Sequence, residues 1–323
     1  MVDVRLPDAL SLAIAAEIGA GSLTARAGAL SDAYRARRPS SSAVTETGDV
    51  AAYLTTRLPA TYAAVTRALD EAISRTEDFA PRSLLDAGAG PGTASWAAAQ
   101  RLAELERITL LDHNRALLDM AGRLAAGSPF PALAGARRVS GSLSAPPADI
   151  RAELVICAYA LTELADGAAI AAALALWEQC DGLFVIVEPG RPRDYERLMA
   201  VRAALFEAGA RIVAPCPHEQ PCPLPPGDWC HFAVRLPRSR AHRQAKAGTL
   251  GYEDEKLSYL AVARPGVSAR PVAARVIRPP SVKKFEVALA LCTEEGLEGR
   301  AVPRREPAAF KAAKKLEWGD PLG

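Results

Sequence analysis

Residues 84–112 read LLDAGAGPGTASWAAAQRLAELERITLLD, and this stretch decides the fold. We expect a short apolar strand over 83–86, a helix over 93–105 and a second apolar strand over 108–112. Gly88, Gly90 and Gly92 stand between the first strand and the helix, where they allow a sharp turn and the close approach of a ligand. The helix that follows offers unpaired N–H groups at its start. The stretch therefore predicts an α/β unit with a ligand-binding turn.

The spacing of the glycines favours one class of nucleotide ligand. A dinucleotide-binding turn has the pattern G-x-G-x-x-G, whereas the third glycine here comes one residue earlier and Asp86 precedes the first. Asp112 ends the second strand, 24 positions after Gly88, where a carboxylate can accept hydrogen bonds from both ribose hydroxyls. The combination resembles the class I S-adenosylmethionine-dependent methyltransferases. The expected cofactor-binding residues are Asp86, Gly88, Gly90, Gly92 and Asp112; the alternative is a tight strand–helix turn without a ligand.

The rest of the chain extends this unit on both sides. Further apolar strands are expected over 154–160 and 183–188, each near a helical segment, which predicts a parallel sheet covered on both faces. Residues 1–78 form an expected N-terminal helical region, with helices over 6–36 and 49–76, the second interrupted by Pro59. Residues 79–210 form the S-adenosylmethionine-binding domain. Residues 211–323 form a cysteine-rich, basic extension that completes the sheet with strands over 232–236 and 257–263.

The composition of the chain predicts its cellular location and the class of its binding partner. The chain has 323 residues, half of them hydrophobic, and no apolar stretch approaches the ~20 residues of a membrane span. The N-terminus lacks the pattern of a secretion signal, so a cytoplasmic protein without membrane association is expected. Residues 1–189 carry 16 Lys/Arg and 22 Asp/Glu, whereas residues 190–323 carry 23 and 15. This asymmetry predicts that the C-terminal half meets a polyanion, the alternative being an ordinary solvated surface.

No catalytic residue follows from the sequence. Methyltransferases that act on amino groups of bases often carry Asn/Asp-Pro-Pro-aromatic after the fourth strand, but residues 157–163 read CAYALTE. Many methyltransferases that act on carbon or oxygen lack that motif as well. Nothing near Cys157 in sequence would lower its pKa, and Glu163 is either a base or a surface carboxylate. The catalytic residues stay unassigned.

Four of the six cysteines are candidates for a metal centre. Cys157 and Cys180 lie in apolar segments and are expected to be small buried hydrophobes. The other four are separated by 5, 7 and 61 residues, without the C-x2-C pairs of common zinc sites, and prolines stiffen the loop around them. Metal binding is favoured over unliganded thiols, and spacing alone leaves zinc and an iron–sulfur cluster equal. The expected ligands are Cys216, Cys222, Cys230 and Cys292, with His218 and His231 as alternatives.

A known family shares these motifs. The glycine turn 88–92, the run 216–232 (CPHEQPCPLPPGDWCHF), the segment 252–259 (YEDEKLSY) and the tail 309–320 together resemble the methyltransferase-like proteins of the mitochondrial small ribosomal subunit and their bacterial relatives. The resemblance covers about residue 50 to the end. It implies a small-subunit assembly or translation factor with an S-adenosylmethionine-type fold. It also implies a four-cysteine [4Fe-4S] cluster on the four cysteines named above, and it leaves methyl transfer open.

A basic segment follows the cysteine run. Residues 235–246 read RLPRSRAHRQAK, with five Arg or Lys and one His among twelve positions. Such density suits rRNA phosphates, and the alternative is a solvated surface. The expected RNA-binding residues are Arg235, Arg238, Arg240, His242, Arg243 and Lys246. Two further functions remain: an active methyltransferase acting on rRNA or a ribosomal protein, and a zinc-stabilised RNA-binding protein without a cofactor, which the glycine turn and Asp112 count against.

Overall fold

A computed structural model describes residues 4–18, 47–245 and 249–323 of the chain. Within these ranges, three helices precede the first strand: α1 (Asp8–Glu17), α4 (Thr47–Thr56) and α5 (Leu58–Arg75). The break between α4 and α5 lies directly before Pro59, as expected, since proline is tolerated only in the first turn of a helix. Most of the helix predicted over 6–36 lies outside the described residues.

The large sheet has a diagnostic strand order. Its strands are β1 (Ser83–Ala87), β2 (Arg107–Asp112), β3 (Arg137–Ser140), β4 (Ala152–Ala158), β5 (Cys180–Pro189), β6 (Arg211–Ala214), β7 (Phe232–Pro237) and β8 (Tyr252–Ala263). They are ordered β3-β2-β1-β4-β5-β8-β6, and β7 pairs with β8. β1 to β5 pair in parallel, whereas β8 is antiparallel to both β5 and β6. This is the class I methyltransferase fold, so the predicted α/β class is confirmed.

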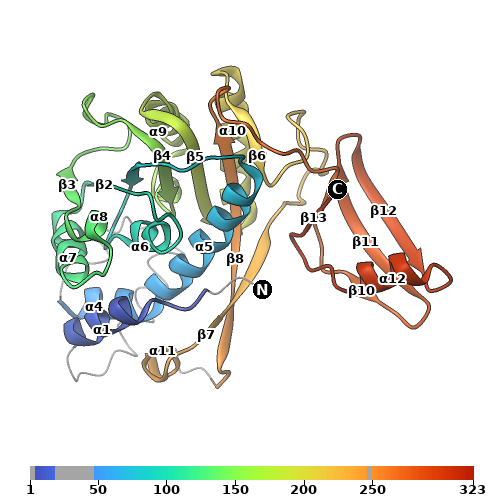
Figure 1. Ribbon diagram of the computed structural model, residues 1–323, viewed down its shortest axis with the longest axis horizontal. Helices are drawn as coiled ribbons and strands as arrows, with labels where there is room; N and C mark the ends of the chain where they lie inside the picture. Colours follow the sequence, from blue (N-terminus) through green and yellow to red (C-terminus); the bar gives the residue numbers. More distant parts are fainter. Residues whose placement is uncertain (1–3, 19–46, 246–248) are drawn as a thin grey trace.

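Helices cover both faces of the large sheet (Figure 1). Helix α5 lies on one face, and the later helices are α6 (Thr93–Ala99), α7 (Arg115–Ala125), α8 (Pro131–Ala134), the 3-10 turn η1 (Leu161–Glu163), α9 (Asp166–Glu178) and α10 (Pro192–Glu207), while α11 (Arg240–Ala245) packs against α4. Because successive strand residues point to opposite faces, Leu84 and Leu154 join the core beneath α5, while Leu85 and Val155 join the core beneath α9 and α10. No helix in the described part of the chain is both long and apolar enough to span a bilayer.

Some elements differ from the expectation. The helix predicted over 93–105 ends at Ala99 and continues as turns, with Arg101 N–H bonded to the carbonyl of Ala98. The short edge strands β3 and β6 were not predicted. Strand β8 starts five residues earlier than expected, because its first half is polar and pairs only with β7.

A second, smaller sheet was also not predicted. It contains β9 (Ala274–Val276), β10 (Ser281–Val282), β11 (Glu286–Thr293), β12 (Gly296–Pro303) and β13 (Pro321–Leu322), with α12 (Pro307–Ala313) packed on it. Thus β7 and β8 of the C-terminal extension join the large sheet, while residues 274–322 form the small one beside it (Figure 1). The apolar core of the small sheet is limited to a handful of side chains, such as Val276, Val287 and Leu291.

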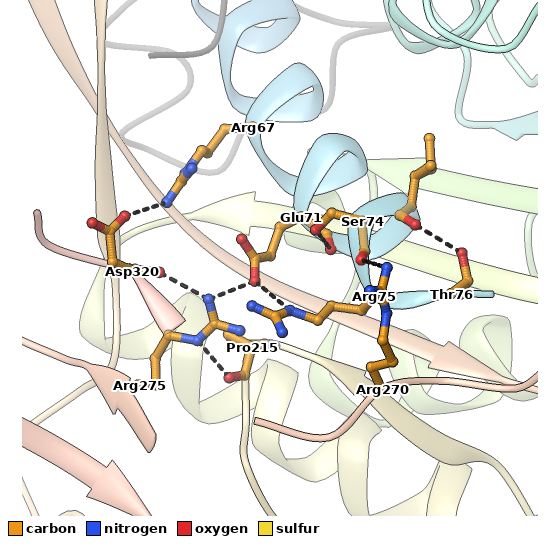
Figure 2. Close-up of polar contacts among 11 residues, drawn as sticks. Arg67, Glu71, Ser74, Arg75, Thr76, Pro215, Arg270, Arg275 and Asp320 are labelled. Carbon is orange, nitrogen blue, oxygen red and sulfur yellow. Dashed lines mark hydrogen bonds and ion pairs between the residues drawn. The ribbon is translucent and has the colours of Figure 1, made fainter. Parts of the chain in front are cut away.

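Polar contacts tie the small sheet to α5 (Figure 2). Arg67 lies 3.7 Å from Asp320, and Arg270 donates to the carbonyl of Ser74 at 3.0 Å. Arg275 from β9 is buried between the two sheets. Its Nε donates to the carbonyl of Pro215 at 2.8 Å, and its Nη1 donates to the carbonyl of Gly319 at 2.8 Å. The small sheet is therefore anchored to the methyltransferase fold by hydrogen bonds.

Candidate cofactor pocket and cysteine centre

The glycine turn adopts a conformation that only glycine tolerates well. Gly88, Gly90 and Gly92 have φ of 73°, 53° and 80°, all in the left-handed region. The N–H of Gly88 bonds to the carbonyl of Leu111 at 2.8 Å, which ties the turn to the end of β2. A Cβ at Gly88 would lie 2.3 Å from the Cβ of Ala160. The turn is therefore fixed in shape by its neighbours β2 and the segment after β4.

Asp112 lies beside this turn, as expected. Its Oδ2 accepts the N–H of Gly90 at 2.8 Å, and its Oδ1 accepts the N–H of Asn114 at 2.7 Å. These two bonds hold the carboxylate at the carboxyl ends of β1 and β2. Each oxygen keeps a lone pair for a further donor, such as a ribose hydroxyl.

Asp86 has a different environment from Asp112. Its Oδ2 accepts the N–H and the hydroxyl of Ser95 at 2.9 and 2.8 Å, so it fixes the start of α6 to β1. Burial raises the pKa of Asp86 to about 7, against the lowering effect of the Ser95 hydrogen bonds. Neither Asp86 nor Gly92 lines the cavity described next, whereas Gly88, Gly90 and Asp112 do.

The glycine turn and Asp112 open onto a cavity of about 320 Å³. Helices α4 and α5 close one side of it with Tyr53, Arg57 and Thr61, and the loop after β3 contributes Ser142 and Leu143. These residues are not among those that the sequence predicts for the pocket. No local motif marks the helical residues, since they reach the pocket only through the packing of α5 against the sheet. The N-terminal helices thus form part of the pocket wall.

Tyr159 lies directly after β4, in the segment that carries the Pro-Pro-aromatic motif in methyltransferases acting on amino groups of bases. It lines the cavity, has φ of 57°, and donates its hydroxyl to Glu255 Oε1 at 2.9 Å. The guanidinium of Arg57 lies 5.7 Å from the centre of its ring. A bulky residue in the left-handed region is strained, and such strain concentrates at functional sites. Glu163, the other candidate after β4, lies at the rim of the same cavity.

Cys157 and Cys180 are core residues, which confirms their interpretation as small buried hydrophobes. Burial raises the pKa of Cys157 well above its usual value, and that of Cys180 to about 12. Because only the thiolate is nucleophilic, neither side chain is activated for chemistry.

The four remaining cysteines line one cavity between the two sheets. Cys216 and Cys222 lie in the loop after β6, Cys230 precedes β7, and Cys292 comes from β11 of the small sheet. Tyr195 donates to the sulfur of Cys222 at 2.9 Å, and His218 Nε2 lies 3.5 Å from that of Cys292. Residues separated by up to 76 positions in sequence thus meet at one place, as the ligand assignment requires.

Burial and the neighbouring thiols favour the protonated form of three of these side chains, Cys216, Cys230 and Cys292, in the absence of a cation. Burial raises the pKa of Cys216, raises that of Cys230 well above its usual value and raises that of Cys292 to about 12, and neighbouring thiols add to each shift. Arg202 and Arg275 have the opposite effect on Cys216 and Cys292. Among the described residues, Arg202 Nε and Arg275 Nη2 are buried donors without a hydrogen-bond partner.

A single-ion site does not emerge from the same residues. Within the described ranges, no group of three or more His, Cys, Asp or Glu side chains is arranged as ligands of one metal ion. His218 Nδ1 lies 3.2 Å from the carbonyl oxygen of Gln220, which accepts when that nitrogen carries the proton, and His231 stacks on Trp229 with ring centres 5.0 Å apart. What the structure brings together is a set of four thiols that share one cavity.

The predicted basic segment is largely paired with acids. Arg235 makes two bonds to Asp254, at 2.7 and 2.8 Å, and Arg238 makes two to Glu253, at 3.2 and 3.1 Å. His242 is buried, with Nε2 3.0 Å from Glu253. Arg243 is exposed on α11, and Lys246 lies outside the described residues, as does the side chain of Arg240. The acids come from the segment 252–259, whose first half faces β7 across the hairpin.

Comparison with known proteins identifies similar chains. The family model described as the mitochondrial small ribosomal subunit protein Rsm22 matches residues 47–323. The human mitochondrial ribosome assembly protein METTL17 is 27% identical over 287 residues, which cover 84% of this chain and 61% of that protein. The Schizosaccharomyces pombe mitochondrial Rsm22-cox11 tandem protein 2 is 25% identical over 184 residues, covering 43% of this chain and 24% of that protein. The chain therefore spans about three fifths of the length of METTL17.

A solved structure gives a weaker likeness. The magnesium protoporphyrin IX methyltransferase of Synechocystis PCC 6803, with S-adenosylmethionine bound, is 14% identical, with a TM-score of 0.41. The match covers 80% of this chain and 98% of that one. The assignment of the fold depends on the strand order given above and not on this likeness.

The comparisons correct one expectation. The matching family and both relatives are described as mitochondrial, so the predicted cytoplasmic location is wrong. The prediction used composition and the absence of an apolar span. Those features do not separate the two compartments, because both are aqueous.

Proposed function

Because the chain belongs to the family of the mitochondrial small ribosomal subunit protein Rsm22, we propose that it is an assembly or translation factor of the small ribosomal subunit. In this proposal it binds S-adenosylmethionine, a [4Fe-4S] cluster and small-subunit rRNA. The observation that carries the proposal is the coexistence, in one chain, of a methyltransferase-type pocket and a four-thiol cavity that joins the two sheets.

The pocket supports the S-adenosylmethionine part of the proposal. Asp112 is held by two backbone N–H groups with lone pairs left for the ribose hydroxyls. Gly88 and Gly90 line the cavity beside it and leave room for the methionine part of the cofactor. Ligands of open α/β sheets bind at this place, outside the carboxyl ends of the strands. The role of Asp86 is indirect, because it fixes α6 through Ser95.

The thiol cavity supports a metal centre, with Cys216, Cys222, Cys230 and Cys292 as ligands. Four thiolates suit an iron–sulfur cluster, and zinc is the alternative. Two buried donors, Arg202 Nε and Arg275 Nη2, are placed to complement the negative charge of a thiolate-ligated centre. Because Cys292 belongs to the small sheet and the others to the large one, the bound metal would hold the two parts of the chain together.

The second candidate function is methyl transfer to rRNA or to a ribosomal protein. The observation that favours it is Tyr159, which lines the cavity together with Glu163 and has a strained φ of 57°. An aromatic ring at this place can hold a planar acceptor against the methyl group. The missing Pro-Pro motif counts against an amino group of a base as the acceptor.

The experiment starts with protein purified without oxygen. A visible absorption band near ~400 nm with about four irons per chain, lost in Cys222→Ser, is expected for the cluster. A colourless protein with one zinc per chain would show that the thiols bind zinc and not a cluster.

Titration calorimetry with S-adenosylhomocysteine is expected to show binding that Asp112→Ala weakens by about 10-fold to 100-fold, since hydrogen bonds to a carboxylate contribute ~1.5–3 kcal/mol. Asp119→Ala, an exposed carboxylate on α7, is the matched control.

Association with the ribosome is measured by sedimentation. Purified protein is mixed with isolated small ribosomal subunits and spun through a sucrose gradient. We expect it to move with the subunit, and less so when the cluster is removed, because the cysteine loop precedes the basic segment by four residues. Wild-type protein that stays at the top of the gradient would remove the assembly-factor proposal, whatever its cofactors.

A further inference from the structure

The turn between β10 and β11 presents an aromatic ring to solvent. Lys283 and Glu286 close this turn twice, by a backbone bond of 2.9 Å and by an ion pair of 2.9 Å. The two residues between them, Lys284 and Phe285, therefore project from its tip. Phe285 is 66% exposed, and the Lys284 ammonium lies 5.1 Å from the centre of its ring. The turn thus carries a solvent-exposed aromatic ring with a cation close to it.

Two arginines follow β12, next to this turn. The N–H of Arg304 bonds to the carbonyl of Phe285 at 2.7 Å, which places the end of β12 against the turn. Arg304 and Arg305 are both exposed, and in the described part of the chain neither has an ion pair. Arg300 on the same strand differs, because Glu298 binds it at 2.7 and 2.9 Å. The residues Lys284, Phe285, Arg304 and Arg305 are called the hairpin-tip surface below.

Among the residues that the structure describes, none of the apolar core clusters includes Phe285 at the hairpin-tip surface. Phe285 is absent from the small core formed by residues such as Val287 and Leu289. The other end of the β11–β12 hairpin lies near the cysteine loop, since a Cβ added at Gly296 would lie 4.0 Å from the Cβ of Pro223. An eight-residue strand separates the two ends by roughly 25 Å. The tip therefore points away from the cysteine centre and is free to meet a partner.

We propose that the hairpin-tip surface binds single-stranded RNA. An exposed ring close to a lysine and to two arginines without an ion pair in the described part of the chain has the chemistry of such a site, in which an unstacked base lies on the ring and the cations contact phosphates. The predicted basic segment, in contrast, has its Arg235 and Arg238 already paired with acids. The inference rests on the proposed function only for the identity of the RNA, which would be a loop or unpaired segment of small-subunit rRNA.

The test uses the full chain and a fluorescent 20-nucleotide RNA of mixed sequence, single-stranded or paired with its complement. Binding is measured by fluorescence anisotropy over a range of KCl concentrations. Phe285→Ala is expected to weaken binding to the single strand about 10-fold with an unchanged salt slope, since stacking is uncharged. The double variant R304E/R305E is expected to weaken binding at least 10-fold and to make the slope shallower by about 1.4, for two lost phosphate contacts.

The matched control is R82E/R107E, which reverses the same number of charges at the amino ends of β1 and β2. Both arginines are exposed there, with 62% and 71% of their side chains accessible. We expect it to change the affinity less than about twofold. If both tip variants bound the single strand like the control, or if Phe285→Ala weakened duplex and single strand equally, the inference would be overturned.

Sedimentation with small ribosomal subunits separates this inference from the proposed function. Wild-type protein that binds the oligonucleotide through the tip but does not move with the subunit would retain the inference and remove the assembly-factor proposal. If wild-type protein moves with the subunit while both tip variants bind the RNA normally, the assembly-factor proposal is retained and the inference about the tip is overturned. Tip variants that bind RNA normally but leave the subunit would identify a ribosomal protein as the partner, which also overturns the RNA assignment.

Discussion

Arg275 Nη1 donates to Glu71 Oε1 at 2.7 Å, across 204 positions of sequence. Both side chains are buried, with 1% and 7% of their surfaces exposed. The same guanidinium holds the carbonyl of Pro215, directly before Cys216. One ion pair thus joins the N-terminal helix α5, the cysteine loop and the small sheet, as Figure 2 shows. Three segments that the sequence places far apart depend on it for their relative positions.

Arg275→Met is therefore expected to destabilise the protein by about 3 kcal/mol, since it leaves Glu71 buried with only Arg75 as a partner. The free energy of unfolding in urea measures this. Arg67→Met, which breaks the partly exposed contact to Asp320, is the control and is expected to cost about 1 kcal/mol or less. Equal losses in the two variants would show that Arg275 acts only as a surface contact.

The elements that sequence reasoning predicted correctly are those with local causes. The turn at Gly88 needs glycine because of its φ and because Ala160 leaves no room for a Cβ. The strands around it are buried on both faces, so their apolar runs are continuous and easy to see. Asp112 could be placed because it ends such a strand. In each case the necessary information lies within a few residues.

The features that were missed depend on contacts between distant segments. Arg57 reaches the cofactor cavity only because α5 packs across the sheet. Asp254 neutralises Arg235 only because the β7–β8 register places them opposite each other. The small sheet has short strands and a small core, so its apolar pattern is weak. Density of charge in a segment does not indicate which charges remain unpaired.

Gly88→Ala is expected to reduce both stability and cofactor affinity. Its new Cβ would meet Ala160 at 2.3 Å in addition to the strain of φ 73°. Gly209→Ala is the matched control, because φ there is 85° but nothing lies within 4 Å. The control shows the cost of the left-handed backbone alone, about 1–2 kcal/mol. Thermal unfolding and calorimetry with S-adenosylhomocysteine are expected to show a further loss in Gly88→Ala, with affinity at least 10-fold lower; identical behaviour of both variants would contradict this.

Asp86 is expected to make stability depend on pH. Its folded pKa of about 7 lies above the ordinary value of 3.8 because of burial, so the folded state binds more protons than the unfolded state between these values. This contribution to stability is complete below pH 3.8 and is lost as pH rises through 7, with a slope of up to about 1.4 kcal/mol per pH unit. Asp86→Asn keeps an acceptor for Ser95 and removes the titration.

The difference in unfolding free energy between wild type and Asp86→Asn, measured from pH 5 to 8, isolates this residue, because other titrating groups cancel. Wild type is expected to lose stability relative to the variant as pH rises. Asp149→Asn, at an exposed carboxylate bound to Arg137, serves as the control. A difference that stays flat across this range would mean that Asp86 keeps an ordinary pKa in the folded protein.

The proposed metal centre predicts that its removal loosens the small sheet from the large one. Cys292→Ala removes the ligand contributed by β11, whereas Cys180→Ala removes a buried thiol that belongs to the core beneath α9. Both variants lose one sulfur, but only Cys292→Ala is expected to lose iron and to become sensitive to limited proteolysis between residues 264 and 281. A chelator is expected to reproduce that cleavage in wild type. If Cys292→Ala kept its metal, the assignment of this ligand would be wrong.

The paired arginines of the basic segment predict a substitution that strengthens RNA binding. Asp254 holds Arg235 by two bonds at an exposed site, so the cation reaches a phosphate only by giving up this partner. Asp254→Asn is therefore expected to tighten RNA binding several-fold and to make its salt dependence steeper. The control is Asp181→Asn, which releases Arg151 from an exposed ion pair at the amino end of β5. Because both variants add one positive charge to the net charge, a gain shared by the two would reflect overall attraction. A gain confined to Asp254→Asn would show that Arg235 contacts the RNA, and no gain in either would exclude this arginine from the interface.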